Sequence, residues 1–300
     1  MKVFVTGASG YIGFQVALAL RRAGHKVWGL VRNQEKGEAL AKNEIIPVIG
    51  NMQRPESYLS VAEQCPVLIH AATEYSAERV TLERLTAESL IRLGNSGAKP
   101  RTFIYTSGVW VYGNTGCQIV DETSPLNPAK LVSWRPGVEE MVLKAKEIKG
   151  IVIRPGCVYG KQGGMTGSWF KGAYKEKALK GTGDGNNHWA MVHAEDLAEA
   201  YLLAAESGLK GEIFNVADRS CSSISENLKA VAGVTGYSGQ IEFIPAEKAS
   251  QTLGDYAYCL ALDQHVDAGK ATRRLGWQPK HSGFGEEVET CFTAWKEAQV

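Results

Sequence analysis

Short apolar segments alternate with segments of helical periodicity through the first half of the chain, and this alternation constrains the fold most strongly. The apolar segments have no polar face, as is typical of strands buried on both sides of a sheet. The predicted strands cover residues 2–6, 26–32, 45–49, 67–71, 102–107 and 151–154, and the clearest predicted helices cover residues 11–23, 76–93 and 132–148. Strands and helices that alternate in this way form a parallel sheet covered by helices, with right-handed crossovers. The sequence therefore predicts an α/β fold with a doubly wound parallel sheet.

The alternation changes after Pro155. Residues 159–187 are rich in glycine and aromatic residues and show no regular pattern. Residues 190–193, a helix over about 195–207 and residues 213–216 then indicate a return to the sheet. The chain from about residue 222 carries further helices and a short strand at 241–244. We therefore expect a large N-terminal α/β domain and a smaller C-terminal lobe interleaved with it.

Charge and composition exclude several classes of protein. The 33 Lys and Arg residues nearly balance the 32 Asp and Glu residues, which leaves no basic surface typical of nucleic-acid or membrane-surface binding. No apolar run approaches the roughly 18 residues of a membrane span, and the N-terminal segment does not have the form of a secretory signal. We therefore expect a cytoplasmic protein whose partner is a small molecule.

Cysteine and histidine spacing gives no sign of a metal site. The six cysteines are widely dispersed and form no CxxC pair, so we expect reduced thiols. His188 and His193 are the nearest histidine pair, and a spacing of five would place them on opposite faces of a strand. On this ground the sequence predicts no metal.

A glycine-rich turn connects the first predicted strand to the first predicted helix. Gly7 permits a tight turn, Gly10 allows the backbone to approach a pyrophosphate, and Gly13 allows close packing of helix on strand. The N-terminus of the helix adds unpaired N–H groups and the positive end of the helix dipole. The order of strand, turn and helix favours a dinucleotide site over a tight turn without a ligand.

The end of the second predicted strand bears on which dinucleotide binds. An NAD site usually has an acidic residue there, which binds the ribose 2′-hydroxyl. This strand ends Leu30-Val31-Arg32-Asn33, without an acid. Because the planar guanidinium of Arg32 suits a 2′-phosphate, we expect NADP(H) rather than NAD. The alternative is a solvated charge at the end of a strand.

Several motifs together resemble a known family. They are Thr6-Gly-Ala-Ser-Gly-Tyr-Ile-Gly13, His70-Ala-Ala-Thr73, Tyr105-Thr-Ser-Gly-Val-Trp-Val-Tyr-Gly113, Ile153-Arg-Pro-Gly-Cys-Val-Tyr-Gly160, Val192-His-Ala-Glu-Asp-Leu-Ala198, Phe214-Asn-Val216 and Leu275-Gly-Trp-Gln-Pro279. The chain resembles the extended short-chain dehydrogenases/reductases, the NAD(P)-dependent epimerase/dehydratase group. The resemblance implies a dinucleotide-binding Rossmann-type domain over residues 1–160, to whose sheet residues 188–220 return. It implies a substrate-binding lobe made of residues 161–187 and 221–300.

The resemblance also implies which residues contact the cofactor. The turn would hold the pyrophosphate, Asn51 would lie near the adenine, and Thr106 would lie near the nicotinamide ribose. The full set implied by the resemblance, together with the 2′-phosphate candidate Arg32, is Gly7, Gly10, Tyr11, Ile12, Gly13, Arg32, Asn51, Ala71, Ala72, Thr106, Pro155 and Val158.

The catalytic set of the family is missing. The family uses a Tyr and a Lys four residues apart after the fifth strand, where the Lys lowers the pKa of the Tyr, and a Ser on the preceding strand. In this chain Leu131 and Arg135 stand at the Tyr and Lys positions, and Gly108 stands at the Ser position. Leucine transfers no proton, and arginine is effectively always charged. The chain therefore resembles an atypical member of the family.

Three residues are candidates for the missing roles. Ser107 is the hydroxyl nearest to the Ser position, Arg135 keeps a positive charge in the site, and Tyr159 is a candidate proton donor after the sixth strand. Each has an ordinary structural alternative: a strand-end hydrogen bond for Ser107, a surface charge for Arg135 and a packed aromatic ring for Tyr159.

Aromatic residues fall on segments that would border the substrate cleft. They are Tyr75, Trp110, Trp134, Trp169 and Trp189, and they favour a ring-bearing substrate, although filling the core between the lobes is their ordinary role. We expect an NADP(H)-dependent oxidoreductase that reduces a carbonyl or enone on a small ring-bearing molecule. The alternatives are an epimerase, dehydratase or other isomerase, and a non-enzymatic NADP(H)-binding sensor. A homodimer is an expectation from the family alone.

Overall fold

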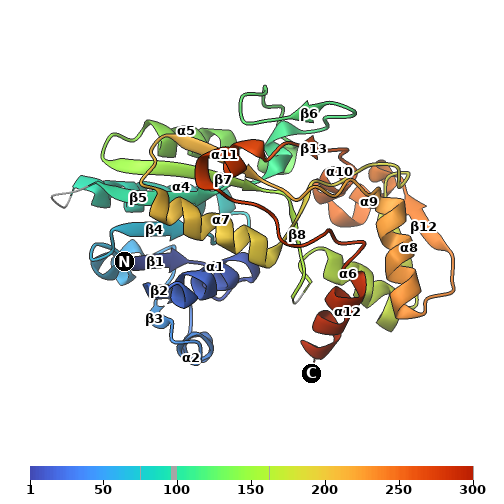
Figure 1. Ribbon diagram of the computed structural model, residues 1–300, viewed down its shortest axis with the longest axis horizontal. Coiled ribbons are helices and arrows are strands. Elements are labelled where there is room, and N and C mark those ends of the chain that lie inside the picture. Colours follow the sequence, from blue (N-terminus) through green and yellow to red (C-terminus); the bar gives the residue numbers. More distant parts are fainter. Residues whose placement is uncertain (75, 96–99, 162, 300) are drawn as a thin grey trace.

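Seven parallel strands form the central sheet of the molecule (Figure 1). The computed structural model describes residues 1–74, 76–95, 100–161 and 163–299. The strands are β1 (Lys2–Thr6), β2 (Lys26–Val31), β3 (Ile46–Ile49), β4 (Val67–His70), β5 (Arg101–Thr106), β7 (Ile148–Pro155) and β11 (Glu212–Val216). They lie in the order β11-β7-β5-β4-β1-β2-β3, and all neighbouring pairs are parallel. This confirms the doubly wound Rossmann-type sheet, whose strand order changes direction between β1 and β4.

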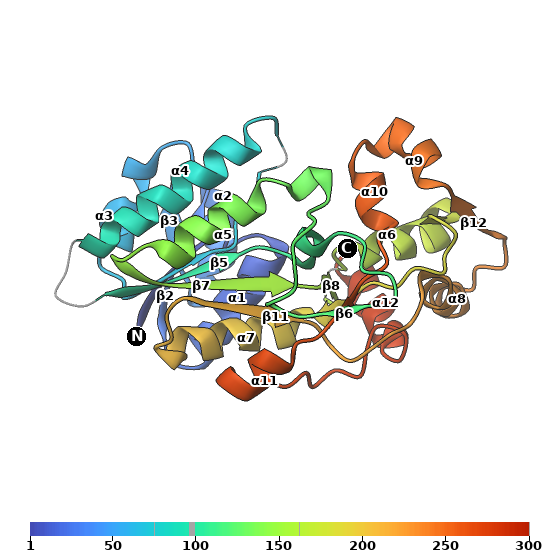
Figure 2. The same ribbon diagram turned by 90° about the horizontal axis from the view of Figure 1, so that it is seen from above.

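Helices cover both faces of this sheet (Figure 2). One face carries α1 (Tyr11–Arg22), α7 (Ala194–Ser207) and α11 (Gly269–Leu275), and the other carries α3 (Leu59–Ala62), α4 (Arg79–Arg92) and α5 (Arg135–Lys144), with α2 (Gln34–Ala41) against β3. Side chains of successive β1 residues point to opposite faces of the sheet. Val3 and Val5 lie in the core on one face, and Phe4 lies in the core on the other. Burial on both faces explains why the strand segments have no polar side.

A second group of elements lies beyond the carboxyl ends of the central strands (Figures 1 and 2). It comprises α6 (Thr166–Phe170), the π-helix η5 (Lys171–Glu176), α8 (Ile224–Thr235), α9 (Ala246–Leu253), α10 (Tyr256–Leu260), α12 (Val288–Glu297) and the parallel pair β9 (Leu179–Thr182) and β12 (Ile241–Ile244). Its core is aromatic and is built around Phe170, Phe284 and Trp295.

Several short elements complete the fold. They are the 3-10 helices η1 (Pro55–Ser57), η2 (Leu93–Asn95), η3 (Val109–Tyr112) and η4 (Lys130–Val132), and the parallel pair β6 (Ile119–Val120) and β13 (His265–Val266). Among the described residues, no helix combines the length and apolar character needed to cross a membrane.

The strand at residues 190–193 differs from the sequence expectation. It does not return to the central sheet; β10 (Met191–His193) pairs instead with β8 (Cys157–Tyr159). Gly156 makes this pairing possible, because a Cβ on it would lie 2.5 Å from the carbonyl oxygen of Ala190. The same oxygen accepts a 2.7 Å hydrogen bond from the N–H of Cys157. The chain therefore leaves the central sheet at Gly156, and only β11 rejoins it.

The boundary between α5 and β7 also differs from the prediction. The helix expected to reach residue 148 ends at Lys144, and β7 begins at Ile148. The longer strand is stabilised by pairing with all of β5, from Arg101 opposite Ile148 to Thr106 opposite Ile153.

A buried ion pair joins β7 to α5. The side chains of Arg154 and Glu139 are only 2% and 3% exposed, and the guanidinium donates to both carboxylate oxygens, with Nε 3.0 Å from Oε1. Arg154 Nη1 also donates to the Tyr112 hydroxyl at 2.8 Å, and that hydroxyl donates to Asn215 Oδ1 at 2.8 Å. One network of side chains therefore connects α5, β7, η3 and β11.

Breaking this pair should be costly. In Glu139→Gln the Arg154 guanidinium keeps its burial and loses its counter-charge, so the free energy of unfolding should fall by about 3–5 kcal/mol. Glu140→Gln is the matched control, because Glu140 is exposed and pairs with Lys144, so its loss should change the free energy of unfolding far less. Urea denaturation of the two variants measures the difference, and equal costs would contradict the role given to the buried pair.

Candidate active and cofactor site

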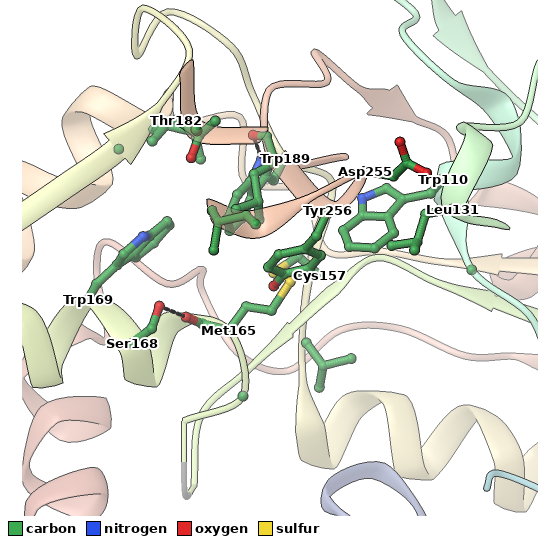
Figure 3. A pocket seen from close by; sticks show the side chains of 18 of the residues that line it. Trp110, Leu131, Cys157, Met165, Ser168, Trp169, Thr182, Trp189, Asp255 and Tyr256 are labelled. Carbon is green, nitrogen blue, oxygen red and sulfur yellow. Dashed lines mark hydrogen bonds between the residues drawn. The ribbon is translucent and has the colours of Figure 1, made fainter. Parts of the chain in front are cut away.

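A cleft of about 1450 Å³ lies between the carboxyl ends of the central strands and the second group of elements. One wall contains the start of α1, the segment after β5 and the segment that follows β7. The other wall comes from α6, β9, α9 and α10 (Figure 3). The change of strand direction between β1 and β4 falls on this side, which is where open α/β sheets bind ligands.

The glycine-rich turn directly precedes Tyr11 and Ile12, which line the cleft, and its backbone fits a dinucleotide pyrophosphate. Gly7 has a φ of +72°, and a Cβ on it would lie 2.6 Å from the carbonyl oxygen of Ala71. A Cβ on Gly13 would lie 2.2 Å from the carbonyl oxygen of Gly7, so both positions require glycine. The first turn of α1 has no capping side chain and no acidic residue, which leaves its N–H groups and positive dipole end for an anion.

Tyr11 and Ile12 line the cleft directly after the turn. The Tyr11 hydroxyl donates a 2.7 Å hydrogen bond to the carbonyl oxygen of Gly160, and its ring packs against Gly164. Burial raises the pKa of this phenol well above its ordinary value, so it remains protonated and continues to donate. Tyr11 thus joins the cofactor turn to the loop that leads into α6.

The residues expected near the adenosine half are placed by local hydrogen bonds. The Arg32 side chain is 64% exposed just after β2, with Nη1 3.4 Å from Glu74 Oε2. Asn51 Oδ1 accepts a 3.0 Å hydrogen bond from the Arg54 N–H, so its side chain stabilises a turn. Ala71 and Ala72, which the resemblance implies line the cofactor cleft, follow β4 and pack against Gly7; neither is among the residues that line the cleft.

Of the residues expected near the nicotinamide, two line the cleft and one does not. Pro155 and Val158, which the resemblance would place beside the nicotinamide, line the cleft. The Thr106 hydroxyl is hydrogen-bonded at 2.6 Å to the hydroxyl of Tyr201 on α7, and Thr106 is not among the cleft residues. The backbone carbonyl oxygen of Thr106, however, accepts a hydrogen bond from Arg135.

Ser107 and Arg135 bring a hydroxyl group and a positive charge into the cleft. Ser107 is 5% exposed and lines the cleft, and among the described residues its hydroxyl has no hydrogen-bond partner. Arg135 begins α5, lines the cleft and donates from Nη1 to the Thr106 carbonyl at 2.8 Å. Its guanidinium also lies over the ring of Trp134, 4.9 Å from the centroid. Gly108 and Leu131 border the same cleft, so the family positions are present with other side chains.

Tyr159 is not placed to act as a proton donor. It is fully buried, packs edge-on against His193 and Phe284, and is not among the cleft residues. Burial raises the pKa of its phenol well above the ordinary value. Tyr159 is therefore a packed aromatic residue, because β8 turns its side chain into the core of the second group.

Three of the five aromatic residues expected to border the substrate cleft line it, and with Tyr256 they form an aromatic wall. Trp169 and Trp189 stack with ring centroids 5.0 Å apart, and Trp110 meets Tyr256 edge-on at 5.9 Å (Figure 3). These four rings line the cleft, whereas Trp134 covers Arg135 and Tyr75 lies outside the described residues. Tyr256 was not anticipated from the sequence, because its place in the cleft depends on how α10 packs.

Sequence reasoning missed a buried polar group behind the cleft. His70 Nδ1 lies 2.6 Å from Thr6 Oγ1, its Nε2 lies 3.7 Å from Glu83 Oε1, and Tyr105 donates to that carboxyl oxygen at 3.2 Å. Burial raises the pKa of Glu83 to about 7, against the opposing charge of Arg135, and burial lowers the pKa of His70 to about 3. Helical spacing could have indicated that Glu83 is buried. Residues 83, 86, 87 and 90 share one face of α4, and those at 86, 87 and 90 are small or apolar.

The raised pKa of Glu83 predicts a pH dependence of stability. Because the pKa lies near 7 in the folded state and near 4.5 for an ordinary glutamate, protonation favours folding. Relative to Glu83→Gln, the wild type should lose up to about 3 kcal/mol of stability as the pH rises from about 4.5 to about 7.

Urea denaturation at several pH values measures this difference. Glu88→Gln is the control, because Glu88 is an exposed glutamate on the same helix. A constant offset between wild type and Glu83→Gln across this range would show that Glu83 does not titrate there.

Comparisons with known proteins identify the family. The model of the NAD dependent epimerase/dehydratase family matches residues 3–217. A 4-hydroxy-2-methyl-3-oxo-4-farnesyl-3,4-dihydroquinoline-1-oxide ketoreductase of Stigmatella aurantiaca is 26% identical over 307 residues, with 92% of each chain covered.

Two solved structures share the fold. A UDP-glucose 4-epimerase with UDP-glucose from Thermotoga maritima has a TM-score of 0.83 at 22% identity and full coverage of both chains. A dTDP-glucose 4,6-dehydratase from Bacillus anthracis in complex with NAD has a TM-score of 0.83 at 19% identity, covering 100% of this chain and 97% of that one. The family match, which spans the glycine turn and all seven strands of the central sheet, shows that the chain belongs to the NAD-dependent epimerase/dehydratase family, the extended short-chain dehydrogenases/reductases.

Proposed function

We propose that this protein is an NADP(H)-dependent reductase that acts on the carbonyl or enone group of a small, ring-bearing and largely apolar molecule. The observation that carries the proposal is the buried hydroxyl of Ser107, which has no hydrogen-bond partner among the described residues and lies in the same cleft as the Arg135 guanidinium. An unpartnered buried hydroxyl costs stability unless a ligand satisfies it, and a carbonyl oxygen is a suitable acceptor.

The aromatic rings support a ring-bearing substrate. Trp110, Trp169, Trp189 and Tyr256 offer flat apolar surfaces inside a cleft large enough for cofactor and substrate together. The similar protein of Stigmatella aurantiaca is named as a ketoreductase of a farnesylated dihydroquinoline oxide, a substrate of this kind.

Two side chains of this chain would stabilise the charge that develops in the reaction. When bound, the reduced nicotinamide supplies a hydride to the electrophilic carbon of the substrate. The Ser107 hydroxyl donates a hydrogen bond to the substrate oxygen, and the fixed positive charge of Arg135 stabilises that oxygen as it becomes negative. Neither group changes its protonation state near neutral pH, so the proton that completes the product comes from water.

The choice of NADP(H) over NAD rests on Arg32. This exposed guanidinium follows β2, where an NAD site would have an acid, and it pairs only loosely with Glu74 at 3.4 Å. A 2′-phosphate would offer it a stronger, bidentate partner.

Turnover tests the catalytic proposal. NADPH oxidation should be observed with a panel of cyclic ketones and enones, and Ser107→Ala should lower kcat by about 100-fold, since removal of one oxyanion donor typically has this effect. Arg135→Met should also lower kcat.

Ser168→Ala is the matched control, because Ser168 lines the same cleft but its hydroxyl already donates to Met165 at 2.7 Å. Its kcat should be unchanged. Redox-neutral conversion of the substrates would favour an epimerase or dehydratase instead, and tight NADPH binding without any turnover would favour a sensor.

Cofactor affinity tests the role of Arg32 separately. Arg32→Ala should weaken NADPH binding by about 10-fold or more and leave NADH binding unchanged, because only NADPH carries the 2′-phosphate. Titration of both dinucleotides measures this, and wild-type affinity for NADH equal to or tighter than that for NADPH would overturn the assignment.

A further inference from the structure

We propose that His188, Asp263 and His265 form a binding site for a divalent transition metal, with Zn²⁺ as the first candidate. One ligand atom of each of the three side chains lies within 4.8 Å of the other two. Imidazole nitrogens and a carboxylate oxygen are ligands that zinc takes in proteins. The three residues lie outside the set that lines the cleft, so this site is distinct from the one that would hold cofactor and substrate.

The distances fit a metal with small adjustments. Asp263 Oδ1 lies 2.9 Å from His188 Nδ1 and 3.7 Å from His265 Nε2. In a tetrahedral zinc site, bonds of about 2.0–2.1 Å place neighbouring ligand atoms ~3.3 Å apart. The two observed separations lie on either side of that value. Asp263 Oδ1 also accepts a 2.8 Å hydrogen bond from the backbone N–H of His188, which a metal would leave in place. A metal would replace the hydrogen bond between His188 Nδ1 and Asp263 Oδ1, whose net contribution of about 1 kcal/mol is small beside that of a metal site.

The backbone that carries these side chains is held in place without a metal. The Asp263 N–H donates to Asn114 Oδ1 at 2.7 Å, and the His265 N–H donates to Thr115 Oγ1 at 3.0 Å. The N–H of the intervening Gln264 donates to the carbonyl of His188 at 2.9 Å, which links the two segments directly.

The Gln264 side chain fixes this segment further, because its Nε2 donates to two backbone carbonyl oxygens, those of Val109 and Gly113, at 2.9 and 2.8 Å. The site is therefore preorganised, and metal binding would not have to order a loop.

Exposure leaves a path to the site. The side chains of His188, Asp263 and His265 are 29%, 27% and 27% exposed, so a hydrated ion can reach them and keep a water as its fourth ligand. This position also suggests what the metal would do. His188 precedes Trp189, which lines the cleft and donates from Nε1 to the Leu260 carbonyl at 3.0 Å. A bound metal would fasten this part of the aromatic wall to β13.

Metal titration tests the proposal. The chelator-treated protein should bind one Co²⁺ or Zn²⁺ per chain. Binding of Co²⁺ is measured by its absorption spectrum, and binding of Zn²⁺ by the rise in melting temperature. His188→Ala and His265→Ala should each weaken binding by more than the roughly 10-fold to 100-fold that loss of an outer partner costs. His281→Ala is the control, because His281 belongs to a separate group with His193 and Glu287. Loss of binding in His281→Ala alone, or no binding by the wild type, would overturn the proposal.

A second measurement needs no variant and decides the question if the variants fail to fold. Wild-type crystals soaked in Zn²⁺ should show anomalous scattering from zinc between the imidazoles of His188 and His265. Anomalous density elsewhere, or none, would overturn the proposal.

Discussion

The buried ion pair between Arg154 and Glu139 is the interaction on which the rest of the site depends. Two charges taken out of water are tolerated only when their hydrogen bonds are satisfied, and here the carboxylate and the Tyr112 hydroxyl satisfy the guanidinium together. The pair fixes α5 against β7. Since Arg135 begins α5 and Pro155 ends β7, the same pair determines where the polar and apolar parts of the cleft lie relative to each other.

The cleft keeps the architecture of its family with different chemistry at its centre. Leu131 and Gly108 border the cleft where the family has proton-transferring and hydroxyl side chains, while Arg135 keeps a positive charge and Ser107 supplies a hydroxyl one residue away. In the function proposed above, this hydroxyl and this positive charge would stabilise negative charge on the substrate. Glu83, whose pKa burial raises to about 7, is buried and is not among the residues that line the cleft.

The features that the sequence predicted well are those set by local pattern. Burial on both faces made the central strands recognisable, and the glycines of the turn have a purely steric reason that is visible in the spacing of Gly7 and Gly13. The failures share a different cause. The pairing of β10 with β8 depends on contact between Gly156 and Ala190, and the position of Tyr159 depends on which way that small sheet faces. The group around His188 escaped notice because Asp263 and His265 come about 75 residues later, and spacing along the chain shows only near neighbours.

The hydrogen bond from Tyr11 to Gly160 joins the start of α1 to the segment that leads into α6. Tyr11 belongs to the first turn of α1, next to the place for the pyrophosphate, and its ring touches Gly164 just ahead of Met165 and α6. One ring therefore lies between the glycine turn and the segment that leads to α6, the helix that presents Trp169. A ligand bound beside the turn and a ligand bound beside Trp169 would each meet an element that Tyr11 contacts.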